Sequence, residues 1–211
     1  MNSISITWNG HSCFTVEKDG FSIVFDPYGP NTVPGLAPLS LTADMVLCSH
    51  EHGDHGYTDA VTLKHSGTKN PFSITKIDTW HDPEQGALRG PALRGPNRIH
   101  ILEADGLKIA HMGDIGCPLI REQKDLLKHL DAILIPVGGY YTIDAVQAKA
   151  VVDDLAPRVV IPMHYRSDHF GYPVIGRLEE FTGLCRNVVE YDSNALLLTA
   201  ETRPQTAVLK L

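Results

Sequence analysis

The segment from residue 50 to residue 55, His-Glu-His-Gly-Asp-His, carries three imidazoles and the carboxylate of Asp54. It directly follows residues 45–48, a short apolar run typical of a strand that is buried on both faces. Rings crowded on one loop would desolvate and repel one another unless a cation shared their lone pairs. Because residues i and i+2 of an extended loop point the same way, His50 and His52 can bind one ion while Asp54 and His55 reach a second. The spacing therefore predicts a pair of metal ions at the end of a buried strand.

The elements around this segment in the first half of the chain have the pattern of β-strands. Lys18-Asp19-Gly20 and Asp105-Gly106 are tight-turn signals between apolar stretches, so each is predicted to close a hairpin. The strands predicted before residue 112 cover residues 4–8, 13–16, 21–25, 45–48, 72–80, 99–103 and 107–111.

Beyond Pro118, which is well placed at a helix start, the apolar period changes and helices alternate with strands. Thr142 is placed to cap the second helix and Pro157 to end it. A last helix is predicted near residues 174–184, and strands at 132–137, 159–162, 196–199 and 207–209. A strand-rich half followed by an alternating half predicts an α/β fold, in which two sheets pack face to face with helices on their outer surfaces.

Composition limits the class of protein. The 211 residues are 43% hydrophobic and 20% charged, which is typical of one soluble globular domain, predicted here to span residues 1–211. The formal net charge of −7 argues against a protein that coats nucleic acid or an anionic membrane. No apolar run reaches the roughly 18 residues that span a bilayer, and the first residues lack the features of a secretory signal, so the expected location is the cytoplasm. The four cysteines are scattered singly, and neither a disulfide framework nor a cysteine zinc site is expected.

The pattern H-x-H-x-D-H after an apolar strand resembles the signature of the metallo-β-lactamase superfamily. Further residues match in the order that this family requires. Asp26, after residues 21–25, resembles an early aspartate that supports the metal loop from behind. His81 resembles the third imidazole on the first ion, Asp114 the carboxylate that bridges both ions, and His164 the last ligand of the second ion. The resemblance therefore implies the metal ligands His50, His52, Asp54, His55, His81, Asp114 and His164.

Taken one at a time, the last three ligands have other interpretations. His65 and His100 lie in the same middle region as His81, which is preferred because it follows a strand and opens a Gly-rich loop. Asp114 follows a glycine at a strand end, where a turn aspartate is equally typical. His164, after Pro-Met, could be a core histidine.

The resemblance implies a four-layer αββα sandwich with the site at one edge of the two sheets, in agreement with the predicted elements. Two divalent ions a few ångströms apart lower the pKa of water and supply hydroxide at neutral pH, so metal-dependent hydrolysis is the expected function. Nitrogen and oxygen donors without a thiolate favour Zn²⁺, and Mn²⁺ or Fe²⁺ fit the same donors. The filled site would carry a net positive charge, so we expect a small anionic substrate: an ester, a lactone or a phosphodiester.

Residues outside the ligand set are further candidates for the site. His11, in Gly10-His11-Ser12, resembles a Gly-His element of the ascorbate-phosphate lactonase-like and N-acyl phospholipase D-like branches. With Asp54 it is the candidate catalytic residue, since its ring could reach the substrate or orient a water; it could equally cap an early turn. Tyr140, Tyr141, Phe170 and Tyr172 are candidates for a pocket wall or for the core, and Arg89, Arg94 and Arg98 for an anion-binding rim or a solvated loop face.

The overall pattern is most similar to the small stand-alone metal-dependent hydrolases of the superfamily. Asp114 stands where many true β-lactamases have a cysteine, so antibiotic hydrolysis is not expected. At 211 residues, neither an appended flavin domain nor a tRNA-gripping arm is expected. The alternatives are an iron-dependent oxidoreductase or dioxygenase, a nuclease, and a metal-stabilised binding protein without activity, and the resemblance allows a homo-oligomer.

Overall fold

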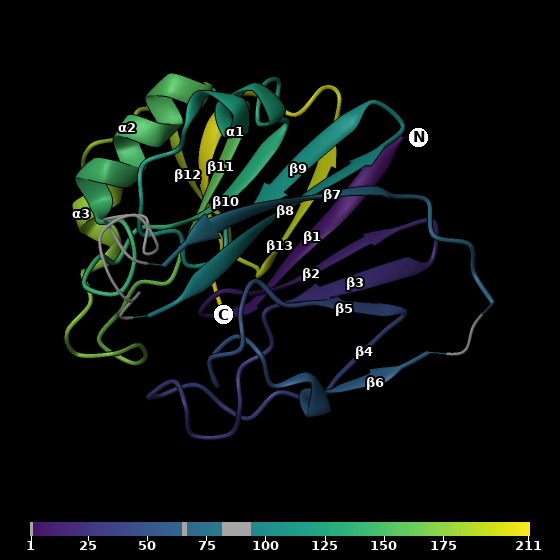
Figure 1. Cartoon of the computed structure of the whole chain (residues 1–211), viewed down its shortest axis with the longest axis horizontal. Coiled ribbons are helices and arrows are strands. Elements are labelled where there is room, and N and C mark those ends of the chain that lie inside the picture. Colours follow the sequence, from purple (N-terminus) through teal and green to yellow (C-terminus); the bar gives the residue numbers. More distant parts are fainter. Residues whose placement is uncertain (1, 65–66, 82–93) are drawn as a thin grey trace.

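The structure is a computed structural model of the 211-residue chain, and it describes residues 2–64, 67–81 and 94–211. Two β-sheets pack face to face in it (Figure 1), as the sequence predicts for an α/β sandwich. A continuous hydrophobic core joins residues of both sheets, among them Ile6 and Phe25 from the first and Ile101 and Ile133 from the second.

The first sheet has five strands in the order β13-β1-β2-β3-β5. They are β1 (Ser3–Gly10), β2 (Cys13–Lys18), β3 (Phe21–Phe25), β5 (Met45–Leu47) and β13 (Ala195–Thr199). Neighbours are antiparallel, except that β3 and β5 are parallel. In β1 the burial alternates, with Ile4, Ile6 and Trp8 buried, because successive side chains of a strand point to opposite faces.

The second sheet has seven strands in the order β12-β14-β11-β10-β9-β8-β7. They are β7 (Ser73–Trp80), β8 (Pro96–Ala104), β9 (Leu107–His111), β10 (Ala132–Pro136), β11 (Val159–Met163), β12 (Val188–Glu190) and β14 (Gln205–Val208). From β12 to β9 all neighbours are parallel, whereas β9, β8 and β7 form an antiparallel meander. Every residue of β10 and β11 is buried, as expected for central parallel strands covered on both faces.

Helices connect the parallel strands of the second sheet and lie against its outer side (Figure 1). They are α1 (Arg121–Leu126), α2 (Ala145–Leu155) and α3 (Leu178–Thr182). Helix α1 begins at Arg121, later than the Pro118 start that the sequence suggests. None of the helices in the described part of the chain is long and apolar enough to cross a membrane.

The cap of α2 differs from the prediction. Asp144 is the N-cap, and its side chain accepts a hydrogen bond of 2.8 Å from the backbone N–H of Gln147. The hydroxyl of Thr142 instead donates to the carbonyl of Ile143 at 3.0 Å. A carboxylate at this position satisfies a free N–H group at a helix start, which explains why the helix begins two residues later than expected.

The outer side of the first sheet is covered by irregular chain, where the sequence prediction had placed helices. Cys13 and Val24 of the sheet pack there against Tyr28 and Val33 of the following segment. That segment also contains β4 (Leu41–Ala43), the 3₁₀ helix η1 (Thr58–Ala60) and β6 (Val61–Leu63). Its first part, residues 27–38, has prolines at four positions and therefore cannot form a regular helix.

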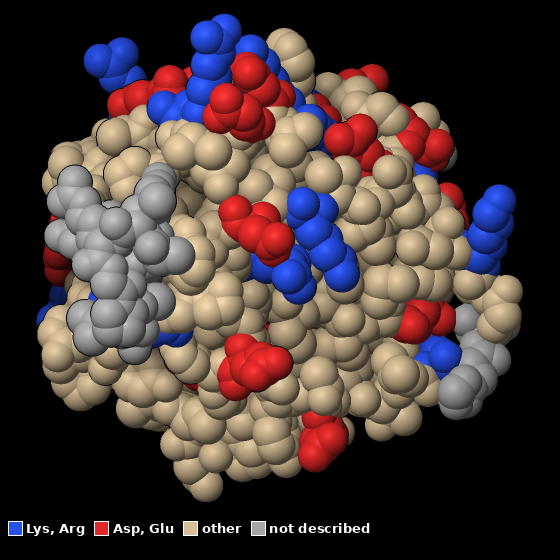
Figure 2. Space-filling view, viewed as in Figure 1, with Lys and Arg blue, Asp and Glu red and all other residues tan. Residues whose placement is uncertain are grey.

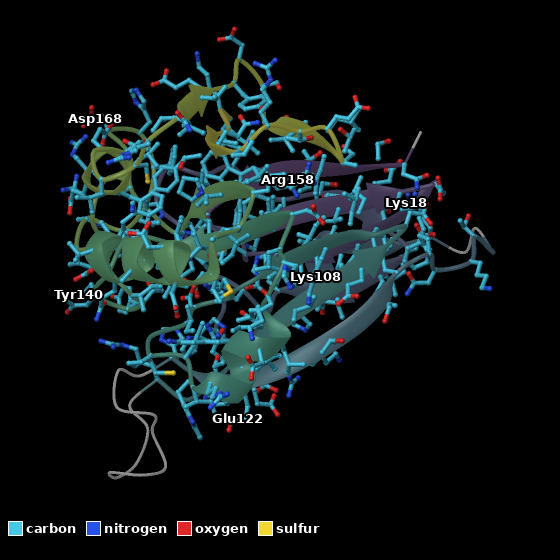
Figure 3. The ribbon with its side chains drawn as sticks, turned by 90° about the horizontal axis from the view of Figure 1, so that it is seen from above. Lys18, Lys108, Glu122, Tyr140, Arg158 and Asp168 are labelled. Carbon is cyan, nitrogen blue, oxygen red and sulfur yellow. The ribbon has the colours of Figure 1, made fainter. Side chains whose placement is uncertain are left out.

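The strands that carry the predicted site residues all end at one edge of the sandwich. β1, β3 and β5 run in one direction, and so do β7, β9, β10 and β11 in the second sheet. Figure 3 shows the two edges: Tyr140, which follows β10, lies at one end of the molecule and Lys18, at the end of β2, at the other. Segments that follow β1, β3, β5, β7, β9 and β11 thus start from the same edge.

Candidate metal centre

The carboxylate of Asp114, directly beyond β9, lies in the middle of the histidine cluster. Its Oδ2 atom is 3.1 Å from Nε2 of His55, 3.2 Å from Nε2 of His81 and 3.1 Å from Nε2 of His164. These side chains come from the ends of four different strands. The structure brings together all seven residues that the sequence predicts as metal ligands; that they bind ions stays a prediction.

The donor atoms fall into three overlapping groups, within each of which all atoms lie within 4.8 Å of one another. The groups are His50, His52 and His81; His50, His55 and Asp114; and His11, Asp54, His55 and His164. The first and third groups correspond to the two ion sites expected from the sequence, with His11 added to the second of them.

Buried atoms without partners test whether these residues fit a metal. Nε2 of His50, Nε2 of His55 and Oδ1 of Asp114 are buried and have no hydrogen-bond partner. Buried polar atoms are almost always paired, so several unpaired atoms aimed at one place need an explanation. Imidazole nitrogens and carboxylate oxygens are ligands that Zn²⁺, Mn²⁺ and Fe²⁺ accept, so the donor set fits a pair of divalent cations.

Asp26, at the end of β3, fixes the orientation of the histidine segment. Its Oδ1 accepts from the backbone N–H of Ser49 at 2.7 Å, and its Oδ2 accepts from the Ser49 hydroxyl at 2.6 Å. Oδ2 also lies 2.8 Å from Nδ1 of His55, and Oγ of Ser49 lies 2.9 Å from Nδ1 of His50. Because these contacts engage Nδ1 of both rings, Nε2 of each ring is directed at the site.

The charges of the cluster are strongly coupled. Burial acts to raise the pKa of Asp114, but His164 and His55 outweigh it and hold the pKa well below its usual range. Burial acts to lower the pKa of His55, yet Asp114 and Asp54 raise it well above 6.5. Burial lowers the pKa of His50 to about 3. At neutral pH the carboxylate of Asp114 is therefore ionised and the ring of His50 neutral, the states in which both can bind a metal.

Asp114 is held by the buried side chain of Asn97 on the neighbouring strand β8. The backbone N–H of Asp114 donates to Oδ1 of Asn97 at 2.9 Å, and Nδ2 of Asn97 donates to the carbonyl of Met112 at 3.0 Å. Gly113 between them has a φ of +56°, and a Cβ there would lie 2.3 Å from Oδ1 of Asn97, so only glycine fits. Asn97 was not predicted from the sequence. It lies two positions before Ile99 and on the same buried face of β8, so a polar residue on an apolar face was the signal that could have identified it.

A second missed residue, His111, connects two segments of the site. Its Nε2 donates to the carbonyl of Ser12 at 2.9 Å, and its Nδ1 accepts from the N–H of Gly113 at 3.2 Å. The ring is buried three positions before Asp114 and stacks on Phe25, with the ring centres 5.0 Å apart. It therefore ties the turn that carries His11 to the segment that carries Asp114.

A cavity of about 230 Å³ opens over the centre. It is lined by His52, Asp54, His81, Arg94, Asp114, Tyr141, His164 and Tyr172. The hydroxyl of Tyr172 donates to Oδ2 of Asp54 at 3.2 Å, a role that the sequence had not shown. The guanidinium carbon of Arg94 lies 5.5 Å from the ring centre of Tyr141, so a cation and two phenols form one wall.

The other histidine candidates are resolved as follows. His11 lies in the cluster, with Nε2 at 3.4 Å from Oδ2 of Asp54. His100 lies within β8, its ring centre 5.8 Å from that of Phe25, and belongs to none of the donor groups. His81 is therefore the better candidate of the two, while His65 lies outside the described residues.

Some of the aromatic and arginine candidates line the cavity and others do not. Tyr141 and Tyr172 line the cavity, whereas Tyr140 is 63% exposed. Phe170 packs on Trp8 and Tyr165. Of the arginines, Arg94 reaches the cavity, Arg98 pairs with exposed Asp78 at 2.9 Å, and Arg89 lies outside the described residues.

Comparison with known proteins defines the class to which this fold and site belong. Residues 5–164 match the family model described as the β-lactamase superfamily domain, so the chain belongs to this superfamily. Within it, the chain is similar to proteins named UPF0173 metal-dependent hydrolase. The one from Carboxydothermus hydrogenoformans is 30% identical over 204 residues, which cover 82% of this chain and 87% of that protein.

Solved structures agree with this assignment. A crystal structure from Thermotoga maritima, assigned to the Zn-dependent hydrolases of the metallo-β-lactamase superfamily, matches with a TM-score of 0.73 and 30% identity, covering 98% of each chain. A metallo hydrolase from Ignicoccus hospitalis matches with a TM-score of 0.67 and 24% identity over 95% of this chain and all of the other, and shares the fold. The predicted metallo-β-lactamase fold is confirmed.

Proposed function

We propose that the protein is a metal-dependent hydrolase that holds two divalent cations, expected to be zinc, and acts on a small anionic ester, lactone or phosphodiester. The observation that carries this proposal is the convergence of three imidazole Nε2 atoms on Oδ2 of Asp114 at the base of the cavity. The names of the relatives from Carboxydothermus and Thermotoga support a metal-dependent hydrolase.

Two of the three donor groups would each hold one ion. His50, His52 and His81 would hold the first ion, Asp54, His55 and His164 the second, with Asp114 between them. When bound, such a pair of ions lowers the pKa of water and supplies a hydroxide at neutral pH. Tyr172 orients Asp54 through its hydroxyl, and the buried rings exclude bulk water from one side of the centre.

The cavity supports a small substrate with negative charge. Its volume of about 230 Å³ lies below the range of roughly 300–1,000 Å³ typical of pockets for drug-sized ligands. Arg94 in its wall offers a positive charge that a carboxylate or phosphate can approach. Figure 2 shows lysine and arginine side chains interspersed with acidic ones on the visible face, which favours a small molecule over nucleic acid there.

Metal analysis combined with a panel of generic phosphodiester, ester and lactone substrates tests the proposal. We expect about two ions per chain in the purified protein and turnover of at least one substrate class. The variant Asp54→Ala should lose turnover at least about a hundredfold, because it removes a donor at the cavity. Asp59→Ala, an exposed aspartate of the same segment, is the matched control and should retain activity. Less than one ion per chain in carefully prepared wild-type protein would contradict the proposal.

The same preparations test the iron-dependent alternative, because nitrogen and oxygen donors also bind Fe²⁺. Iron content and oxygen uptake on a thiol substrate are measured beside hydrolysis. We expect no iron in the purified protein and no oxygen uptake. Iron together with oxygen uptake would replace hydrolysis by oxidation as the function of this centre.

A further inference from the structure

His11 lies in the turn between β1 and β2, and its backbone is anchored at the site. Gly10 has a φ of +105° and His11 a φ of +51°, so the chain reverses sharply here. The carbonyl of His11 accepts from Nε1 of Trp8 at 2.9 Å and from the N–H of His164 at 3.4 Å. A non-glycine residue with positive φ is uncommon and is often found at functional sites, and this one is fixed directly beside a predicted ligand.

The ring of His11 is buried and lacks the partners that a buried imidazole needs. The residue is 1% exposed, and neither ring nitrogen has a hydrogen-bond partner. Nε2 lies 3.4 Å from Oδ2 of Asp54, and the ring centre lies 4.1 Å from that of His164 and 5.5 Å from that of His55. An unpaired polar group in such a position is costly unless a ligand satisfies it.

His11 does not line the cavity. The lining includes Asp54 and His164 but not His11, which is 1% exposed. A group that acts on a substrate in this cavity must reach its surface, and His11 does not. Its donor atom instead lies within 4.8 Å of the donor atoms of Asp54, His55 and His164.

We infer that His11 is a ligand of the second cation, which it binds together with Asp54, His55 and His164. This inference rests on the proposed two-ion centre. It changes the role of His11 from the candidate catalytic residue predicted from the sequence, which contacts substrate or orients a water, to a metal ligand. It also makes the two ions unequal. The second ion has four protein donors besides Asp114, the number that closed sites use, whereas the first has the three imidazoles of His50, His52 and His81.

Zinc titration of metal-free protein tests this inference without an activity assay. We expect wild-type protein to bind two Zn²⁺ ions, as measured by competition with a chromogenic chelator. His11→Ala should retain one ion and bind the other at least tenfold more weakly. His129→Ala is the matched control, because it removes an exposed imidazole that belongs to none of the donor groups, and it should bind both ions as the wild type does.

Each outcome bears on a different claim. Wild-type affinity for both ions in His11→Ala would overturn the inference, and absence of zinc binding in the wild-type protein would overturn the proposed function itself. If His11→Ala does not fold, as judged by circular dichroism, the ¹⁵N resonances of His11 in wild-type protein decide. A shift of Nε2 on addition of zinc supports ligation, and unchanged resonances at two equivalents overturn it.

Discussion

Asp26 lies outside the cavity, yet three of its contacts orient donors of the centre. Ser49 and Nδ1 of His55 share its carboxylate, and His111 and His55 lower its pKa to about 2 although burial acts to raise it. The carboxylate is therefore ionised throughout the physiological range. It stabilises the ring orientation that directs Nε2 of His55 toward Asp114 and Asp54.

Replacing Asp26 by asparagine should weaken metal binding without unfolding the protein. The amide keeps one acceptor for the N–H of Ser49 but cannot hold Nδ1 of His55 as a carboxylate does. We expect zinc affinity to fall about 10- to 100-fold, the usual effect of losing such a supporting group. Asp44→Asn is the control, because Asp44 accepts from the N–H and hydroxyl of Ser22 in the same way but away from the centre. Equal affinities of the two variants would show that Asp26 does not support the ligands.

The sequence identified the residues that cluster in the structure better than the groups that position them. The seven predicted ligands stand out because histidine and aspartate have few structural reasons to follow apolar strands in that order. Tyr172 contacts Asp54 from 118 positions away, His111 contacts Ser12 from 99 positions away, and Asn97 contacts Asp114 from 17 positions away, so local sequence does not predict these contacts. The backbone conformation at the site was not predicted either. His11, Asp26 and His164 have positive φ values of 51°, 44° and 53°, which residue type alone does not predict.

Among the elements, strand direction explains why the site forms where it does. The segments with His11, Asp26, His50, His81, Asp114 and His164 each follow the carboxyl end of a strand. Strands that run in one direction within each sheet bring these ends to one edge, as in other sheets whose ligands bind beyond the strand ends. The sequence predicted most of these strands from apolar runs and turns. It missed β12, whose residues are all exposed, and the three-residue strands β4 and β6, because short or exposed strands lack an apolar pattern.

The N-cap of α2 should contribute measurably to the stability of the protein. Asp144→Ala removes the acceptor for the N–H of Gln147, so the free energy of unfolding should fall by about 1 kcal/mol. Asp153→Ala changes the same residue type in the same helix, where an exposed pair with Lys149 is worth at most about 0.5 kcal/mol. Urea unfolding of both variants measures the difference. A loss for Asp153→Ala as large as that for Asp144→Ala would mean that the cap does not hold the helix start.

Over the whole molecule, buried histidines make stability depend on pH. Burial lowers the pKa of His100, 1% exposed in β8, to about 4; Asp26 opposes this shift, and smaller effects of His111, Lys76 and Arg98 add to it. Its pKa in the unfolded chain is about 6.5. Between these two values the unfolded chain binds more protons than the folded one, so stability is complete above pH 6.5 and is lost as the pH falls toward 4.

The variant His100→Gln isolates this contribution because glutamine does not titrate. Between pH 7 and pH 5 the free energy of unfolding of metal-free wild-type protein should fall by about 2 kcal/mol more than that of the variant. Urea unfolding at the two pH values measures it. The other buried histidines contribute equally to both proteins, so identical pH dependence would mean that His100 is not neutral and buried in solution.

Removal of metal should destabilise the whole fold, because the proposed ligands join both sheets. The segments of the first sheet contribute His11 and His50 to His55, and those of the second contribute His81, Asp114 and His164. An ion bound only by the folded chain stabilises it by about 2.7 kcal/mol at a hundred times its Kd, and 1 kcal/mol shifts Tm by roughly 2–4 °C at this size. We therefore expect treatment with a chelator to lower Tm by about 5–10 °C for each ion lost, and zinc to restore it. The doubly changed variant Asp114→Asn with His164→Ala removes the shared carboxylate and a donor of the second ion but keeps the imidazoles of His50, His52 and His81. Its Tm should therefore respond to chelator and zinc about half as much as that of the wild type or less. A metal response equal to that of the wild type would place the bound ions elsewhere than between the two sheets.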